Sequence, residues 1–253
     1  MKKALIIATF GSTHEDALRR DLDPVVEELK KAAAGFDVRV TFTSRMVIRR
    51  YENKTGMRYA NEVEAVEALT DEGFEPEAIF LQPLHLIEGF EYAKLSRLKE
   101  RGIHVGEALF HDEEDVAEFV KSLDFRFQVP TVFVGHGSDA PADKYYGDLN
   151  SKFREEKLPH RVCTIEGAID EKEPLDFMKE KGYTEVQLAP LLLLAGDHAK
   201  NDVFGEKGSV KTRFEQAGIS VKPVEGGMGS WDFVRAMYVR KLLQLLGDDV
   251  CEN

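Results

Sequence analysis

Short apolar runs that alternate with amphipathic helical stretches along the whole chain constrain the fold more than any other feature. The runs are continuous rather than alternately polar, which is typical of strands buried on both faces of a parallel sheet. Strands are predicted at residues 4–9, 38–43, 78–84, 104–108, 131–134, 161–165, 186–194 and 220–223. Between them, helical periodicity covers residues 16–34, 61–71, 90–101, 113–123 and 175–181, with a final helix at 231–246. The pattern predicts an α/β protein of the doubly wound type.

The chain also repeats itself. An apolar strand leads into Thr9-Phe10-Gly11-Ser12 in the first half and into Gly135-His136-Gly137-Ser138 in the second. A later strand in each half contains Pro-Leu with a glycine six residues after the proline, at Pro83-Leu84 and Pro190-Leu191. We therefore predict two similar Rossmann-like domains. Residues 1–127 are expected to form the first and residues 128–229 the second.

Composition narrows the possible functions. With 46 acidic against 34 basic residues, the net charge of −12 disfavours binding to nucleic acids or membrane surfaces. Two cysteines, Cys163 and Cys251, are too few for a disulfide framework or a thiolate metal cluster. No apolar run approaches the roughly 18 residues of a membrane span, so we expect a cytoplasmic protein. The absence of a phosphate-binding loop and of G-x-G-x-x-G disfavours nucleotide chemistry, and no prosthetic group is expected.

Three polar side chains follow predicted strands of the second half. His136 follows the strand at 131–134, Glu166 the strand at 161–165, and His198 the strand at 186–194. Parallel strands present their carboxyl ends together, so these side chains should share one rim of the sheet. Two imidazoles and a carboxylate suit a divalent ion such as cobalt, iron, nickel or zinc, with coordination positions left open. The alternative is that each histidine is a hydrogen-bonded structural residue.

The first half carries weaker candidates. Ser12 followed by Glu15 three residues later is typical of a helix capping box. Alternatively, the same helix start could hold an anionic group such as a substrate carboxylate. His85 ends an apolar strand on the matching rim, where it would either line a pocket or be a buried core histidine.

These segments also carry a resemblance to a known family. The segment Leu194-Ala195-Gly196-Asp197-His198-Ala199-Lys200-Asn201-Asp202 is the most specific, together with Phe42-Thr43-Ser44-Arg45-Met46-Val47-Ile48-Arg49 and Val134-Gly135-His136-Gly137. In these the chain resembles the anaerobic-type sirohydrochlorin cobaltochelatases (the CbiK family), relatives of ferrochelatase. The resemblance covers nearly the whole length and implies His136, Glu166 and His198 as the metal-binding and catalytic set. It also implies a pseudo-two-fold axis between the two domains, a cleft between them, and a C-terminal helix over about 230–248 that packs back on the first domain. Gly167 and Ala168 depart from the bulkier residues expected after Glu166.

The resemblance implies ATP-independent insertion of Co²⁺ into sirohydrochlorin, a lyase-class step of anaerobic cobalamin biosynthesis. Co²⁺ is then a substrate, with Fe²⁺ or Ni²⁺ as the open alternatives. His136 is expected to accept a pyrrole proton, because imidazole titrates near neutrality. A tetrapyrrole or metal carrier without turnover and a metallohydrolase remain competing hypotheses. A homo-oligomer is possible.

The two halves should differ in chemistry. Aligning the Gly-Ser pairs places Phe10 where the second half has His136, and aligning the prolines places Glu91 where it has His198. The first half therefore lacks both imidazoles, and one metal per chain is expected. An aromatic ring suits a flat macrocycle, so the first half is predicted to bind the tetrapyrrole. The predicted substrate-binding residues are Phe10, Gly11, Ser12, Thr13 and His85.

Overall fold

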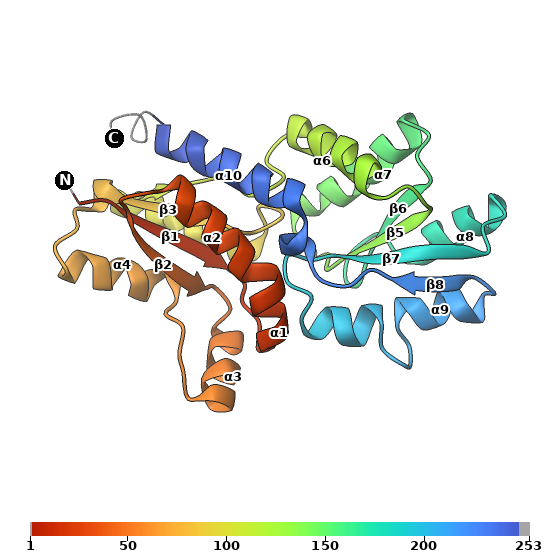
Figure 1. Cartoon of the computed structure of the whole chain (residues 1–253), viewed down its shortest axis with the longest axis horizontal. Helices are drawn as coiled ribbons and strands as arrows, with labels where there is room; N and C mark the ends of the chain where they lie inside the picture. Colours follow the sequence, from red (N-terminus) through yellow and green to blue (C-terminus); the bar gives the residue numbers. More distant parts are fainter. Residues whose placement is uncertain (1, 248–253) are drawn as a thin grey trace. The chain divides into compact units, whose positions relative to one another are not determined.

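The computed structural model describes residues 2–247 of the 253-residue chain, which form two compact units (Figure 1). The first unit contains the residues up to His111 and those from Gly229 onward, and the second is Asp112–Met228. Each unit has one four-stranded parallel sheet flanked by helices, which confirms the predicted α/β class with two Rossmann-like domains. None of the described helices is long and apolar enough to cross a membrane.

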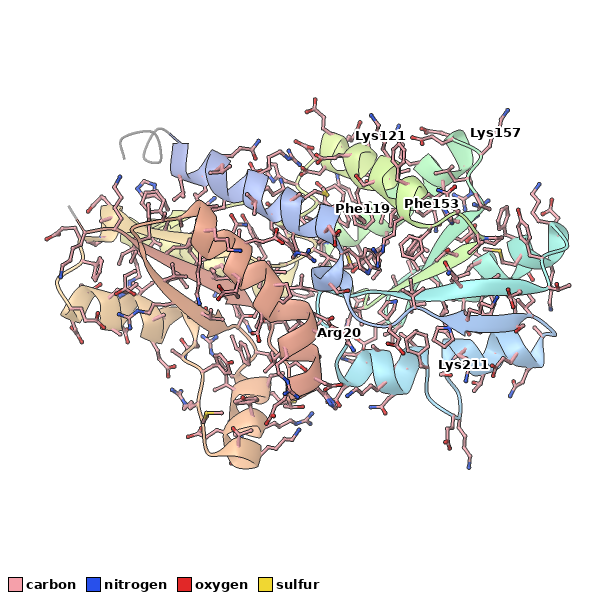
Figure 2. The ribbon with its side chains drawn as sticks, viewed as in Figure 1. Arg20, Phe119, Lys121, Phe153, Lys157 and Lys211 are labelled. Atoms are coloured by element: carbon pink, nitrogen blue, oxygen red, sulfur yellow. The ribbon has the colours of Figure 1, made fainter. Side chains whose placement is uncertain are left out.

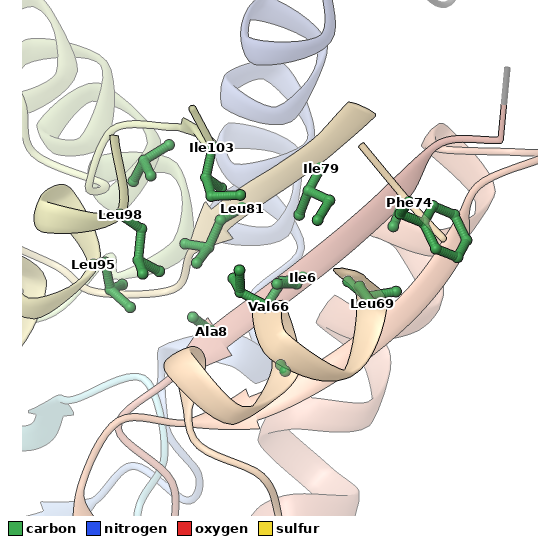
Figure 3. Close-up of a cluster of buried hydrophobic side chains, with 13 residues drawn as sticks. Ile6, Ala8, Val66, Leu69, Phe74, Ile79, Leu81, Leu95, Leu98 and Ile103 are labelled. Atoms are coloured by element: carbon green, nitrogen blue, oxygen red, sulfur yellow. The ribbon is translucent and has the colours of Figure 1, made fainter. Parts of the chain in front are cut away.

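The sheet of the first unit has the strand order β2-β1-β3-β4. Its strands are β1 (Ala4–Thr9), β2 (Asp37–Phe42), β3 (Ile79–Pro83) and β4 (His104–Val105). One face packs on α4 (Glu62–Asp71) and α5 (Phe90–Ser96) through a cluster that includes Ile6, Leu69, Leu81 and Leu95 (Figure 3). Leu5 and Ile7 of β1 alternate with Ile6 and are also fully buried, on the opposite face. On that face, α10 (Asp232–Leu246) packs against β3 and α2 (Asp23–Ala32).

The sheet of the second unit has the equivalent order β6-β5-β7-β8. Its strands are β5 (Thr131–Gly135), β6 (His160–Thr164), β7 (Glu185–Leu191) and β8 (Ser220–Pro223). One face packs on α8 (Lys172–Glu180) and α9 (Val210–Gln216). The other is covered by α6 (Glu113–Arg126) and α7 (Lys144–Glu155), whose Phe119 and Phe153 are fully buried. Figure 2 marks these two rings beside the exposed Lys121 and Lys157 on the same part of the unit.

One helix that follows each sheet in the sequence packs in the other unit. Helix α6 follows the last strand of the first unit but packs against α7 in the second, and α10 follows β8 but packs in the first. The division therefore falls at Asp112, before α6, and not at the predicted position 127 after it. Arg235 and Lys241 tie α10 to the first unit, through ion pairs with Glu28 at 2.5 Å and Glu107 at 3.1 Å.

Several elements differ from the sequence expectation. The predicted helix at 16–34 is α1 (Glu15–Ala17), the π-helical η1 (Leu18–Leu22) and α2 in succession. No helical range was predicted for α3 (Arg45–Thr55), α7 or α9. The remaining short elements are the 3₁₀ turns η2 (Pro76–Ala78), η3 (Arg97–Arg101), η4 (Pro141–Asp143) and η6 (Met228–Ser230), and the π-helical η5 (Ala199–Val203). Cys163 is buried, whereas Cys251 and position 248 of the predicted final helix lie outside the described residues.

Candidate functional site

The turns that follow β1 and β5 depend on glycine. Gly11 has a φ of +94° and Gly137 a φ of +75°, in the region that side chains disfavour. A Cβ atom on Gly11 would lie 2.5 Å from the ring of Phe42, and one on Gly137 would overlap the carbonyl oxygen of Glu166. Both turns therefore press against the strand-end segment next to them, and only glycine fits. The repeat identified in the sequence is a repeat of this backbone geometry.

The serine hydroxyls of the two turns accept equivalent hydrogen bonds. The backbone N–H of His14 donates to the Ser12 hydroxyl at 3.1 Å, and that of Ala140 donates to the Ser138 hydroxyl at 3.1 Å. The capping box predicted for Ser12 and Glu15 is therefore wrong, because His14 is the N-cap residue of α1 and no side chain caps that helix. The Ser12 hydroxyl bonds two residues ahead instead of three.

His136 is the first residue after β5, directly before Gly137, and it is partly buried. Its Nδ1 lies 2.7 Å from the carbonyl oxygen of Gly137. A carbonyl oxygen can only accept, so Nδ1 carries the hydrogen, and the Nε2 of the neutral ring has a free lone pair. Asp143 stabilises this turn, because its carboxylate accepts hydrogen bonds from the N–H of Ser138 at 2.6 Å and from the hydroxyl of Ser138 at 2.7 Å.

His198 approaches the same point from the segment after β7, where it is the helical N-cap residue of η5. Its Nδ1 lies 2.8 Å from a carboxylate oxygen of Asp202, one helical turn further on. This carboxylate accepts the Nδ1 hydrogen, so the Nε2 lone pair of the neutral ring is again free. Sequence reasoning missed Asp202, although the spacing of four residues from His198 on a helical turn is the signal that could have found it.

The two imidazoles meet at their Nε2 atoms, which lie 3.2 Å apart with the rings nearly perpendicular. Because Gly137 and Asp202 both take Nδ1 hydrogens, two lone pairs face each other across this distance when both rings are neutral. Such a pair is stabilised only by a shared proton or a shared cation. Imidazole nitrogens bound to one tetrahedral metal at 2.0–2.1 Å are about 3.3 Å apart. The pair therefore has the spacing of two ligands of one divalent metal ion, and it also offers a proton acceptor.

Glu166 reaches this rim through its backbone. Its N–H donates to the carbonyl oxygen of His136 at 2.7 Å, while the residue itself is exposed. Over residues 2–247, no three side chains of the His, Cys, Asp and Glu types are gathered closely enough to hold a metal. The structure thus brings His136 and His198 together without the Glu166 carboxylate. The next residue, Gly167, has a φ of +112° and would bring a Cβ to 2.9 Å from Asp143, which explains why no bulkier residue stands there.

Phe10 occupies the place of His136 in the first unit. The N–H of Ser44 donates to the Phe10 carbonyl oxygen at 3.3 Å, just as Glu166 donates to His136. The Phe10 ring is 42% exposed, whereas Ser12 is buried. The carbonyl oxygen of Thr13 accepts from the Lys54 ammonium group at 2.8 Å. Of the predicted substrate-binding residues in this loop, Phe10 is thus the most exposed, and Thr13 is partly exposed.

His85 follows β3 on the same rim. Its Nε2 lies 3.4 Å from the Thr43 hydroxyl, and its Nδ1 is buried without a hydrogen-bond partner. Burial lowers the pKa of His85 to about 4, against the opposing effect of the nearby Glu91 carboxylate. The ring is therefore neutral at physiological pH.

This depressed pKa predicts a stability effect. Below about pH 6.5 His85 is protonated in the unfolded chain, whereas in the folded protein it stays neutral down to about pH 4. The free energy of unfolding therefore falls as the pH falls through that window. At pH 5 the loss from this group is about 2 kcal/mol relative to pH 8. In His85→Gln the loss of unfolding free energy between pH 8 and pH 5, measured with urea, should be smaller by that amount. Equal losses in the variant and the wild type would contradict this, and the exposed His104→Gln serves as the control.

Nearly the whole chain is similar in sequence to cobalt chelatases. The family model described as cobalt chelatase (CbiK) matches residues 3–246. The sirohydrochlorin cobaltochelatase of Salmonella typhimurium is 32% identical over 260 residues, which span 97% of each chain. The sirohydrochlorin cobaltochelatase CbiKC of Nitratidesulfovibrio vulgaris is 26% identical over 246 residues, spanning 91% of this chain and 86% of that protein.

Proposed function

The chain belongs to the cobalt chelatase (CbiK) family, and from this premise we propose that it inserts Co²⁺ into sirohydrochlorin. The observation that carries the proposal is the pair of Nε2 atoms of His136 and His198, 3.2 Å apart. Each lone pair is held ready by an acceptor on the opposite side of its ring. We assign this reaction to the lyase class and to cobalamin biosynthesis in the cytoplasm, with no ATP and no prosthetic group.

The reaction exchanges one cation for two protons. Metal-free sirohydrochlorin and Co²⁺ give cobalt-sirohydrochlorin and two H⁺, so the protein must hold the ion, release it and accept protons. His136 and His198 supply two neutral nitrogen ligands, which bind divalent ions without the tight grip of thiolates. When the ion leaves, the pair regains its affinity for a proton, so one imidazole can take a pyrrole proton in the same step. His136 is our candidate for the acceptor.

Glu166 is proposed as the third member of the set. Its backbone bond to His136 fixes the start of the side chain at the rim, and its exposed carboxylate is free to rotate. We expect the carboxylate to join the imidazoles when a divalent ion binds. It could also relay the second proton to solvent.

Asp202 should tune the metal affinity of His198. Replacing Asp202 with asparagine keeps the shape but removes the charged acceptor, so the ring loses both orientation and basicity. Loss of such a partner typically weakens metal binding 10–100-fold. Titration of Co²⁺ by competition with a chromophoric chelator should show this loss in Asp202→Asn. The matched variant Asp148→Asn, on α7 of the same unit, should bind Co²⁺ like the wild type, and an unchanged affinity in Asp202→Asn would refute the assignment.

Anaerobic incubation with sirohydrochlorin and Co²⁺, followed by visible spectroscopy, tests the proposed function. The chelatase should convert many equivalents of tetrapyrrole per chain. Conversion limited to one equivalent would identify a tetrapyrrole or metal carrier instead, and no spectral change would favour a metallohydrolase. Parallel reactions with Fe²⁺ and Ni²⁺ compare the metals, and the proposal expects Co²⁺ to give the highest kcat/KM.

A further inference from the structure

Three large apolar side chains of the first unit are exposed after three neighbouring strands. Phe10 follows β1 and is 42% exposed, Met46 lies in the first turn of α3 after β2 and is 54% exposed, and Phe90 begins α5 after β3 and is 67% exposed. The strands are parallel and adjacent, so their carboxyl ends lie along one edge of the sheet. We call Phe10, Met46 and Phe90 the apolar rim.

Local contacts connect the three positions. Ser44, two residues before Met46, donates its N–H to the carbonyl oxygen of Phe10 at 3.3 Å. The Nε2 of His85, in the segment that leads from β3 to Phe90, lies 3.4 Å from the hydroxyl of Thr43, which directly follows β2. Exposed apolar side chains cost free energy in water, and a group of them at one edge indicates a ligand surface.

Unpaired arginines stand beside the apolar rim. Met46, Arg50 and Lys54 are four residues apart on α3 and so form one ridge, which ends where Lys54 bonds to Thr13. Arg49 and Arg50 are exposed and form no ion pair with a described residue. In the same unit Arg39, Arg45 and Arg58 pair with acidic side chains, whereas Arg19 and Arg97, like Arg49 and Arg50, are exposed and form no ion pair with a described residue. What distinguishes Arg49 and Arg50 is their place next to an exposed apolar group, where two positive charges suit an anionic ligand with an apolar body.

We propose that the apolar rim and Arg49–Arg50 recognise a carboxylate-bearing tetrapyrrole. The flat conjugated ring covers Phe10, Met46 and Phe90, and its peripheral carboxylates pair with the two guanidinium groups, which match carboxylates in geometry. This inference rests on the proposed function and extends it to substrate specificity. Arg49 and Arg50 select macrocycles rich in carboxylates, and the apolar rim supplies affinity that does not depend on the metal.

The test is equilibrium binding of metal-free sirohydrochlorin, followed by fluorescence titration of the full-length protein. Phe90→Ala and Met46→Ala should each raise the Kd about tenfold, because each removes roughly the contact area of one buried apolar side chain. The exposed Phe125→Ala and Met57→Ala are matched controls away from the rim, at 78% and 61% exposure, and should leave the Kd unchanged. The Co²⁺ affinity measured without tetrapyrrole should be the same in all four variants.

The arginines are tested by charge and salt. The double variant Arg49→Gln/Arg50→Gln should bind sirohydrochlorin at least tenfold more weakly at low salt and lose most of the salt dependence of the wild type. Arg97→Gln, an exposed arginine of η3, is the control. Wild-type Kd values in the Phe90, Met46 and double-arginine variants, or equal losses in the controls, would overturn the proposal. Binding needs no turnover, so wild-type binding without cobalt insertion would refute the proposed function and not this surface.

Discussion

Replacing His136 or His198 with alanine is expected to lower kcat for cobalt insertion on the order of 10³-fold. Each substitution removes one of two facing metal ligands and a proton acceptor, and loss of a positioned acid–base group alone typically costs 10²–10⁴-fold. Both side chains lie at the rim of the sheet and carry little core packing. The thermal unfolding midpoint should therefore stay within a few degrees of the wild type. The measurement is the initial rate of cobalt-sirohydrochlorin formation at saturating substrates.

A matched control separates the imidazole pair from a general loss of histidine. His104→Ala removes an exposed ring on β4, an edge strand of the first sheet, where the ring stacks on Phe80. It should retain wild-type kcat. Near-full turnover in either His136→Ala or His198→Ala would show that the catalytic site lies elsewhere.

The second large effect is on stability. Gly137→Ala is expected to lower the free energy of unfolding by about 4 kcal/mol or more, because its Cβ would overlap the Glu166 carbonyl oxygen at a φ of +75°. The neighbouring backbone must move, and with it the bond between Glu166 and His136. Urea unfolding measures the loss. Gly147→Ala, inside α7 with open space around the position, should instead stabilise by about 0.5–1 kcal/mol. Similar unfolding free energies for Gly137→Ala and the wild type would contradict the packing described for this turn.

The sequence predicted most of the fold because buried parallel strands leave a strong pattern. The bounds of β1 and β8 match the prediction, and each of the other six strands overlaps its predicted apolar run. Helix α3 was missed because only Val47, Ile48 and Tyr51 of its residues are buried, which leaves a weak apolar stripe. Its Ser44 N-cap and the left-handed Gly56 at its end were available as signals. The exchange of α6 and α10 between units could not be read from periodicity, because it depends on tertiary packing.

The candidate site was predictable to a similar degree. Strand-end positions placed His136 and His198 on one rim, and the structure brings their rings into contact. The role of the Gly137 carbonyl as acceptor for the Nδ1 hydrogen of His136 required coordinates, because a carbonyl group leaves no mark in a sequence. The role of Asp202 did have a signal, its spacing of four residues from His198. Met46, Arg50 and Phe90 were missed for a related reason. Exposure is a property of packing, and each residue type occurs just as readily in a core or on an ordinary surface.

In the function that we propose, His136 and His198 together hold the ion that is inserted. X-ray absorption at the cobalt edge of the Co²⁺-loaded protein, without tetrapyrrole, measures this directly. This arrangement predicts two imidazole nitrogens in the first coordination shell of cobalt at about 2.1 Å, and one in each of His136→Ala and His198→Ala. The same imidazole count in the wild type and in both variants would contradict it.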